Sequence, residues 1–121
     1  MALGVLPDEP ARPVNFLRPC LLLLLAEHSG HGYELTERLA PLAGDTPDTA
    51  VVYRALNAME DEGLVISQWE RSTEGPVRRC HALTAEGRAA LIAWAVQLAD
   101  LDVLVGGLLE QLAARGLLRA A

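Results

Sequence analysis

The stretch between Thr46 and Ala82 constrains the fold of this chain more than any other. Thr46 followed by Pro47 is typical of a helix start. A threonine side chain can cap the first turn, and a proline at the first helical position loses no hydrogen bond, because the N–H there has no partner within the helix. Apolar residues at helical spacing follow, and Gly63 stands where a left-handed helix end is expected. Two β-prone segments separated by turn residues complete the stretch. The pattern predicts a helix followed by a β-hairpin with strands at residues 64–70 and 77–82.

Two shorter helices are expected before this stretch. Pro19 starts the first, whose residues 21–27 are nearly all apolar, as in a helix that is buried on every side. A Ser-Gly-His-Gly segment then breaks the helix. Residues 33–39 are expected to form the second helix, and Pro41 to end it. Two helices joined by short turns, then a third helix and a hairpin, predict a winged helix-turn-helix.

The last third of the chain is expected to form one long helix capped by Thr84. Apolar residues recur there at intervals of seven in two series offset by three, which is the pattern by which helices associate. The domain core does not need so long a seam, so we expect much of it to face a second copy in a homodimer. The Gly106-Gly107 pair is expected to bend the helix or end it early. The seam residues are Leu91, Trp94, Leu98, Leu101, Val105, Leu108 and Leu112.

These patterns give the expected organisation. The fold class is mainly α with a small antiparallel β-hairpin: a loose N-terminal arm at 1–14, a winged helix-turn-helix DNA-binding domain at 15–83, and a dimerisation helix with its tail at 84–121. The longest unbroken apolar run, residues 20–26, is far shorter than the ~20 residues of a membrane span. No signal-peptide pattern is present, and the two cysteines are expected to be reduced thiols. We therefore expect a cytoplasmic protein with no membrane span.

Charge is unevenly distributed along the chain. The net charge is −6, and all ten basic residues are arginines. The predicted β-hairpin, called the wing below, carries three arginines (71, 78 and 79) against Glu74 between residues 71 and 79, a local charge of +2. The third-helix region carries five acids (45, 48, 60, 61 and 62) against Arg54, a local charge of −4. An acidic total disfavours nucleic acid, but a basic wing beside a helix-turn-helix is a usual footprint of DNA binding. The positive charge of the wing favours contact with phosphate, and the negative charge of the third-helix region disfavours it.

Several motifs, in this order, resemble the PadR family of bacterial repressors. They are HGYEL at 31–35, VYRALNAMEDEGLV at 52–65, EGPVRRCHALTAEG at 74–87 and the amphipathic tail. NFLRPCLLLLL at 15–25, with SQWERSTEGPVRR at 67–79, more closely resembles the branch of poly-β-hydroxybutyrate-responsive repressors.

The resemblance covers about residues 15–112. It implies a dimeric winged helix that binds a pseudo-palindromic operator and is released by an effector. The third helix and the wing would contact DNA, and the C-terminal helix would form the dimer. The family usually carries tyrosine where this chain has His81, and Leu98 occupies the place of the tryptophan that sandwiches drugs in multidrug-binding members.

Residues on the third helix and the wing are the candidates for DNA contact. Arginines of the wing can neutralise phosphates or enter a minor groove; alternatively, Arg71 or Arg78 pairs with Glu70 or Glu74 on a solvated strand. Asn and Arg on the helix can read adenine and guanine edges. Asp48 can accept from cytosine, but we favour a helix N-terminal carboxylate stabilised by the helix dipole. The candidates are Thr46, Thr49, Tyr53, Arg54, Asn57, Arg71, Arg78 and Arg79.

Two tryptophans suggest an effector site. Trp69 and Trp94 can wall an apolar pocket, or they can simply pack, Trp69 under the wing and Trp94 in the dimer seam. The expected effector is a small apolar molecule or a polyhydroxyalkanoate. The candidate residues for it are Phe16, Trp94 and Leu98.

Other chemistry is not indicated. Cys80 and the three histidines show no CxxC or HxxxH spacing, so no metal site is expected, and no cofactor motif is present. Ser29 between His28 and His31 lacks a nucleophile elbow and an orienting acid, so we expect no catalytic residues and no enzyme. Two alternatives to a DNA-binding regulator stay open: a protein-interaction module whose acidic third helix binds a basic partner, and a granule- or lipid-associated module using the apolar first helix.

Overall fold

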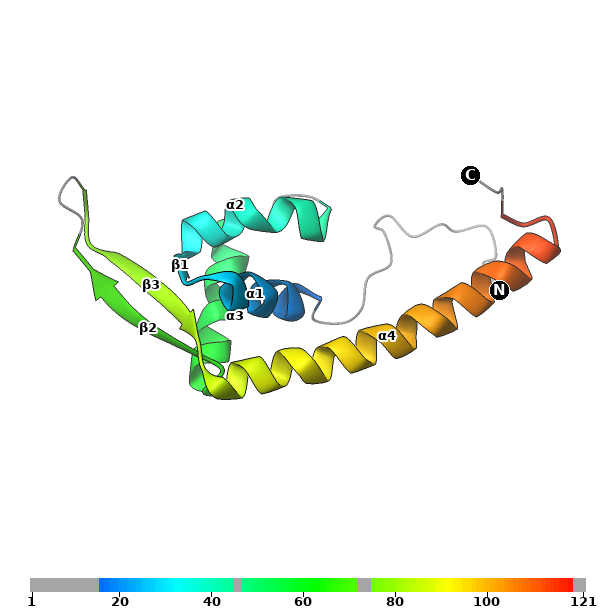
Figure 1. Ribbon diagram of the computed structural model, residues 1–121. Coiled ribbons are helices and arrows are strands. Elements are labelled where there is room, and N and C mark those ends of the chain that lie inside the picture. Colours follow the sequence, from blue (N-terminus) through cyan, green and yellow to red (C-terminus); the bar gives the residue numbers. More distant parts are fainter. Residues whose placement is uncertain (1–15, 45–46, 72–74, 119–121) are drawn as a thin grey trace.

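The computed structural model describes residues 16–44, 47–71 and 75–118, so the predicted arm and Thr46 lie outside the described residues. In Figure 1, three helices pack together, a β-hairpin projects to one side and a long helix extends to the other. This arrangement is a winged helix-turn-helix with a long C-terminal helix, which confirms the predicted fold class. The elements in chain order are α1 (Leu17–Glu27), β1 (Gly30–His31), α2 (Gly32–Ala43), α3 (Thr49–Asp61), β2 (Val65–Glu70), β3 (Arg78–Leu83) and α4 (Ala85–Ala114).

The hydrophobic core lies where α1 meets α2, α3 and the start of β2. Six of the eleven residues of α1 are buried, which agrees with its all-apolar sequence. The helix α1 begins at Leu17, two residues before the predicted start at Pro19. Pro19 is tolerated inside the first turn because the N–H groups there have no partner within the helix, so the missing N–H of proline costs no hydrogen bond. The fully buried core side chains are Leu21, Leu22, Leu35, Leu39, Val52, Leu56, Met59 and Val65.

The segment between α1 and α2 contains a strand that the sequence pattern did not predict. Gly30 and His31 form β1, which pairs antiparallel with β3, so the sheet has three strands in the order β1-β3-β2. Pro41 also differs from the prediction, since it lies inside α2, which continues to Ala43. Gly44 ends the helix instead, with a left-handed φ of 88° and an N–H···O bond of 3.0 Å to Ala40.

The start of α3 corrects a further prediction. The helix begins at Thr49, and the Asp48 carboxylate accepts a hydrogen bond of 2.9 Å from the Ala50 N–H. Asp48 is therefore the cap, Pro47 lies before the helix, and the interpretation of Asp48 as a helix N-terminal carboxylate is confirmed. At the other end Gly63 has φ 81°, the left-handed conformation that its position predicted.

Helix α4 runs unbroken over thirty residues. Thr84 caps it as predicted, accepting from the Gly87 N–H at 2.9 Å, whereas the Gly106-Gly107 pair does not interrupt it. Within the described chain, α4 is the one helix long and apolar enough to cross a bilayer, with a mean hydropathy of 1.6 and none of that window buried. The sequence analysis did not identify α4 as long and apolar enough to span a bilayer, because it considered unbroken apolar runs and scattered polar residues interrupt them in this helix. A helix covered by a second copy has the same composition.

An ion pair between α1 and the residue that follows α3 gives this fold a dependence on pH. Arg18 Nη1 donates to Glu62 Oε1 at 2.9 Å, and this hydrogen bond is the main reason that the pKa of Glu62 is lowered. The pair therefore stabilises the fold above the ordinary glutamate pKa, and this contribution is lost as the pH falls through the lowered value.

We expect Glu62→Gln to lower the melting temperature near pH 6 and to flatten its decline between about pH 6 and about pH 3, because the titrating partner is gone. The effect is small, since Glu62 is exposed. Thermal melts across this range measure it, with Glu110→Gln on α4 as the control. Equal declines in the wild type and in Glu62→Gln would contradict the role of the pair.

Candidate nucleic-acid interface

One stripe of α3 faces away from the core. Thr49, Tyr53 and Asn57 follow one another at intervals of four, so they share a face of the helix. Asn57 is exposed and Tyr53 is 37% exposed. The Tyr53 ring lies against Gly32, where a Cβ would stand 2.3 Å from the ring carbon Cζ. The absence of a side chain at Gly32 thus positions Tyr53 at the surface.

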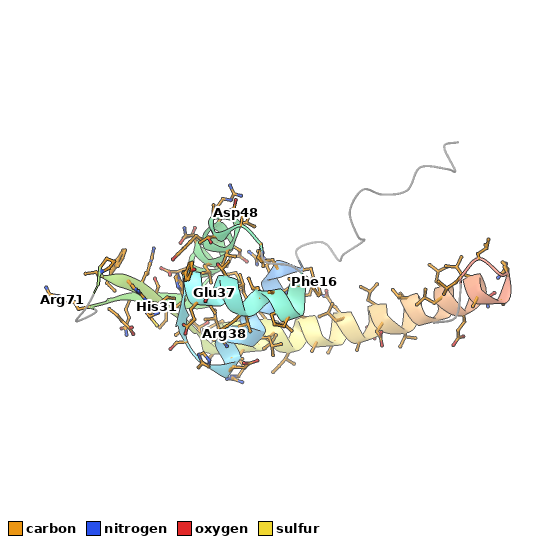
Figure 2. The ribbon with its side chains drawn as sticks, turned by 90° about the horizontal axis from the view of Figure 1, so that it is seen from above. Phe16, His31, Glu37, Arg38, Asp48 and Arg71 are labelled. Atoms are coloured by element: carbon orange, nitrogen blue, oxygen red, sulfur yellow. The ribbon has the colours of Figure 1, made fainter. Side chains whose placement is uncertain are left out.

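An open cavity of about 670 Å³ lies between this stripe, α2 and the wing. Four predicted residues line it together: Tyr53 and Asn57 from α3, and Arg78 and Arg79 from β3. The other described DNA-contact candidates, Thr49, Arg54 and Arg71, are not part of its lining. Figure 2 shows Arg71 at the outer end of the wing. The sequence analysis considered Trp69 only as a possible wall of an effector pocket and proposed none of the other lining residues for DNA contact. The further lining residues are His31, Tyr33, Glu34, Glu37, Trp69 and Val77.

Arg79 fastens the wing to α3. Its Nε donates to Ser67 Oγ at 2.6 Å, and its Nη2 lies 2.9 Å from Glu60 Oε2. The sequence analysis considered ion pairs of Arg71 or Arg78 with Glu70 or Glu74. The pairs with Glu70 are not formed, Glu74 lies outside the described residues, and Arg79 is the wing arginine that the described structure pairs. Its charge is thus compensated within the chain. Arg71 and Arg78 are exposed, and neither forms an ion pair with another described residue, so among these residues they are the wing arginines without a compensating charge.

Trp69 does not pack under the wing. Its side chain is 67% exposed, and the Arg79 guanidinium lies 5.9 Å from the centre of its ring. This distance allows a cation–π contact, which adds to the ion pair in holding Arg79 in place. Trp69 therefore presents an apolar surface to the cavity between α3 and the wing.

Acidic side chains from α2 border the same cavity. Glu34 and Glu37 are both exposed, and Figure 2 shows Glu37 on α2. Glu34 accepts from the backbone N–H of His31 at 3.2 Å as part of a capping box. The cavity therefore combines the guanidinium of Arg78, which has no acidic partner in the described part of the chain, with two carboxylates, and it is not a uniformly basic surface.

His81 lies beneath Tyr53 in the interior. Its side chain is fully buried, with the Tyr53 ring in an edge-on arrangement at 6.5 Å. Neither ring nitrogen has a hydrogen-bond partner among the described residues. Burial is the main cause of its lowered pKa, and the nearby charge of Arg79 acts in the same direction. The imidazole is thus a neutral packing group that supports Tyr53 from below.

The three effector candidates meet in a second, apolar cavity. Phe16, Trp94 and Leu98 all line a space of about 360 Å³ between the start of α1, the end of α2 and the first half of α4. Figure 2 shows Phe16 beside α4. Phe16 precedes α1 and is distant in sequence from the two α4 residues, so this convergence is a result of the fold. The remaining lining residues are Pro19, Cys20, Leu23, Leu42, Leu91 and Ala95.

Comparison with known proteins gives a family match. The model of the transcriptional regulator PadR-like family matches residues 21–93, and no curated protein matches the chain. Similar solved structures include a PadR family regulator from Eggerthella lenta (29% identity, TM-score 0.66, 80% of this chain and 88% of that chain). A PadR-like regulator from Bacillus cereus is 25% identical, with a TM-score of 0.68 over 77% of this chain and 90% of that chain. Bacillus subtilis PadR in complex with operator DNA is 22% identical, with a TM-score of 0.63 over 69% of this chain and 49% of that chain; this likeness shows the fold alone.

Proposed function

The chain belongs to the PadR-like family of transcriptional regulators, and we propose that it binds double-stranded DNA in the cytoplasm as an effector-responsive repressor. The observation that carries this proposal is the placement of Tyr53 and Asn57 of α3 beside Arg78 of the wing, on one open cavity. A helix with outward polar side chains can reach base edges in a major groove while a flanking arginine contacts phosphate. Bacillus subtilis PadR, which shares the fold, was solved with operator DNA.

A homodimer is the form that we propose for DNA binding. Leu91 and Trp94 pack against the domain core, but the later seam residues Leu101, Val105 and Leu108 are 38%, 44% and 61% exposed. Apolar residues repeated at heptad spacing on an isolated helix call for a second helix to cover them. Two chains joined along α4 would present two α3–wing surfaces to a pseudo-palindromic site, about one turn or ~34 Å apart.

The apolar cavity between α1 and α4 is the proposed effector site. Its volume of about 360 Å³ and its lining by Phe16, Trp94 and Leu98 suit a small apolar molecule or a short segment of a polyhydroxyalkanoate. Because this cavity borders both the DNA-binding domain and the proposed dimer helix, a ligand there would change the angle between the two domains of a dimer. That change would alter the spacing of the two wings and release the operator.

A salt-dependent titration tests DNA binding. The full-length protein is titrated at low salt into duplexes from upstream of its own gene and into random duplexes of equal length. We expect tighter binding to the upstream DNA, and affinity for both that falls steeply as salt rises. Absence of any binding at micromolar protein, together with binding to a basic peptide, would overturn the proposal in favour of the protein-interaction alternative.

Arg78→Ala is expected to weaken binding to specific and random DNA alike. If Arg78 contacts a phosphate, the slope of log affinity against log salt should fall by about one for each protomer. Arg88→Ala on α4 is the matched control, since Arg88 is exposed but does not line the cavity. A change confined to one DNA sequence would instead assign base reading to Arg78.

Glu37→Gln is expected to strengthen DNA binding. Its carboxylate borders the cavity that also holds Arg78, so removing this charge should raise affinity at low salt by about threefold, with the gain fading as salt is added. Titrations at two salt concentrations measure the change. Glu86→Gln, an exposed glutamate in the first turn of α4, is the control and should leave the affinity unchanged. An unaltered affinity in Glu37→Gln would place the DNA away from α2.

A further inference from the structure

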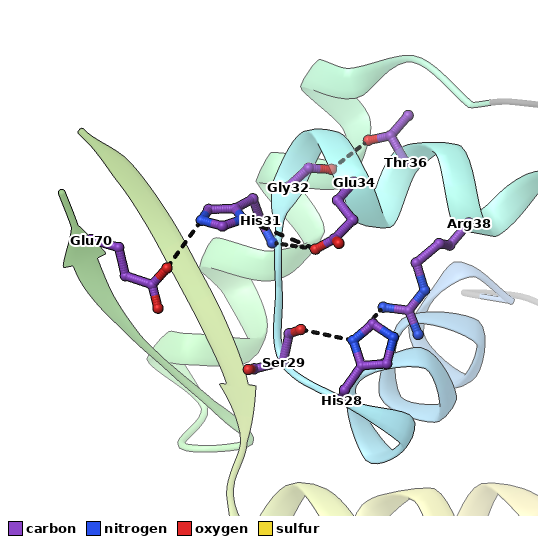
Figure 3. A network of polar contacts seen from close by, with 8 residues as sticks. All are labelled: His28, Ser29, His31, Gly32, Glu34, Thr36, Arg38 and Glu70. Carbon is purple, nitrogen blue, oxygen red and sulfur yellow. Dashed lines mark hydrogen bonds and ion pairs between the residues drawn. The ribbon is translucent and has the colours of Figure 1, made fainter. Parts of the chain in front are cut away.

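Three potential metal ligands meet where the wing joins the helices. The sheet brings His31 of β1 directly opposite Cys80 of β3, and Glu70 of β2 lies two residues beyond Gln68, the other partner of Cys80. Glu70 and Cys80 therefore lie on the same face of the sheet. One ligand atom from each of His31, Glu70 and Cys80 lies within 4.8 Å of the others. Figure 3 shows the His31 imidazole pointing toward Glu70, with Nε2 and Oε2 3.3 Å apart.

The chemistry of this set is specific. One imidazole, one thiolate and one carboxylate are a donor combination that Zn²⁺ accepts, and ligand atoms around tetrahedral zinc stand about 3.5 Å apart. The His31–Glu70 separation already matches that spacing, and small side-chain rotations of the half-buried Cys80 and the exposed Glu70 can close the remainder. We propose that His31, Glu70 and Cys80 bind a zinc ion with three protein ligands, leaving a fourth position for water.

The surroundings of the set also suit a metal. Glu34 Oε1 lies 4.0 Å from the second ring nitrogen of His31, Nδ1, so a further negative charge stands beside the imidazole, although at this distance it forms no hydrogen bond with the ring. A cavity of about 160 Å³ lined in part by Ser29, Glu70 and Cys80 leaves room for the water ligand. On binding, the thiol proton passes to solvent and the thiolate coordinates the ion.

A metal here would act as a clamp. It would tie together all three strands, including β1, which leads directly into α2. The wing would then be fixed relative to the helices. If the wing contacts DNA as proposed above, zinc binding should change the affinity for DNA. The binding of zinc itself does not depend on the proposed function.

Co²⁺ absorption tests the site without DNA. The chelator-treated full-length protein is titrated with Co²⁺ and then with Zn²⁺. We expect one Co²⁺ per chain, a thiolate-to-cobalt charge-transfer band and its loss on adding Zn²⁺. Cys80→Ser should abolish the band, and His31→Gln or Glu70→Gln should weaken Co²⁺ binding at least about tenfold.

Two controls separate this site from other donors. His28→Gln changes an exposed neighbouring histidine, and Cys20→Ala removes the other cysteine; both should keep the band. Circular dichroism of each variant reports whether it is folded. Co²⁺ binding without the charge-transfer band, or with equal affinity in folded Cys80→Ser, would overturn the zinc site. Either result would leave the DNA titration, done without metal, to decide the proposed function separately.

Discussion

Gly87→Ala is expected to be among the most destabilising single substitutions in this chain. Gly87 is buried in the first turn of α4, and an added Cβ would stand 2.1 Å from the Leu64 carbonyl oxygen and 2.6 Å from Leu83 Cδ1. The Leu64 carbonyl cannot easily move, because it accepts a hydrogen bond from Thr84 N at 3.1 Å. Relieving the overlap requires α4 to shift away from the hairpin, at a cost of about 3 kcal/mol in the free energy of unfolding.

Urea denaturation at neutral pH measures this loss. Gly106→Ala is the matched control, because Gly106 lies in the same helix and a Cβ there meets nothing within 4 Å. That variant should gain up to about 1 kcal/mol from improved helix propensity. Equal stabilities for Gly87→Ala and Gly106→Ala would contradict the close contact between α4 and Leu64, the residue before β2.

The paired substitution Leu101→Glu and Leu108→Glu is expected to have the largest effect on DNA binding. Both residues belong to the exposed seam of α4, and two charges on each helix would oppose two facing copies of themselves. We expect the variant to sediment as a 13.0 kDa monomer. It would engage only one half of an operator at a time, and the loss of simultaneous engagement lowers affinity by about 100-fold or more.

The control for this variant is Val103→Glu. Val103 is 74% exposed on the same stretch of helix but lies off both heptad series. Sedimentation and operator titration of this control should match the wild type. If the seam variant stays dimeric, or if Val103→Glu dissociates as readily, the seam is not the dimer interface.

Local sequence signals predicted most of the helices and strands. The heptad series and the Thr84 cap predicted a long final helix, and the left-handed Gly63 was identified by its place after an apolar helix. Where the local signal was ambiguous, the prediction failed: Thr46 and Asp48 are both good caps, and the structure uses Asp48. Pro41 failed for the opposite reason, since a single proline in a last turn does not outweigh the packing of the helix around it.

Contacts between distant segments were beyond the sequence patterns. A strand of two residues, such as β1, has no periodicity, and only its pairing with β3 defines it. The ion pair of Arg79 with Glu60 joins the wing to α3 and could not be separated from the local pairs considered for Arg71 and Arg78. The ligands of the proposed zinc site come together in the same way: Cys80 and His31 meet through strand register, not through a spaced motif.

The predicted DNA-contact residues that line the cavity divide into two groups in the structure. Tyr53, Asn57 and Arg78 converge on one cavity, because α3 and the wing pack side by side. Arg79 lines the same cavity, but its guanidinium forms an ion pair with Glu60 and so connects the wing to α3. Compensation of charge by a nearby acid is a tertiary property, so counting arginines on the wing overestimated the charge available to phosphate.

The central claim is that two copies joined along α4 bind one operator. The mass of the protein–DNA complex tests this claim most directly. Light scattering is recorded for the free protein and for its complex with one short duplex from upstream of its gene. The account predicts a free particle of twice 13.0 kDa and a complex of two protomers on one duplex. A 13.0 kDa particle that binds the duplex one to one would contradict it.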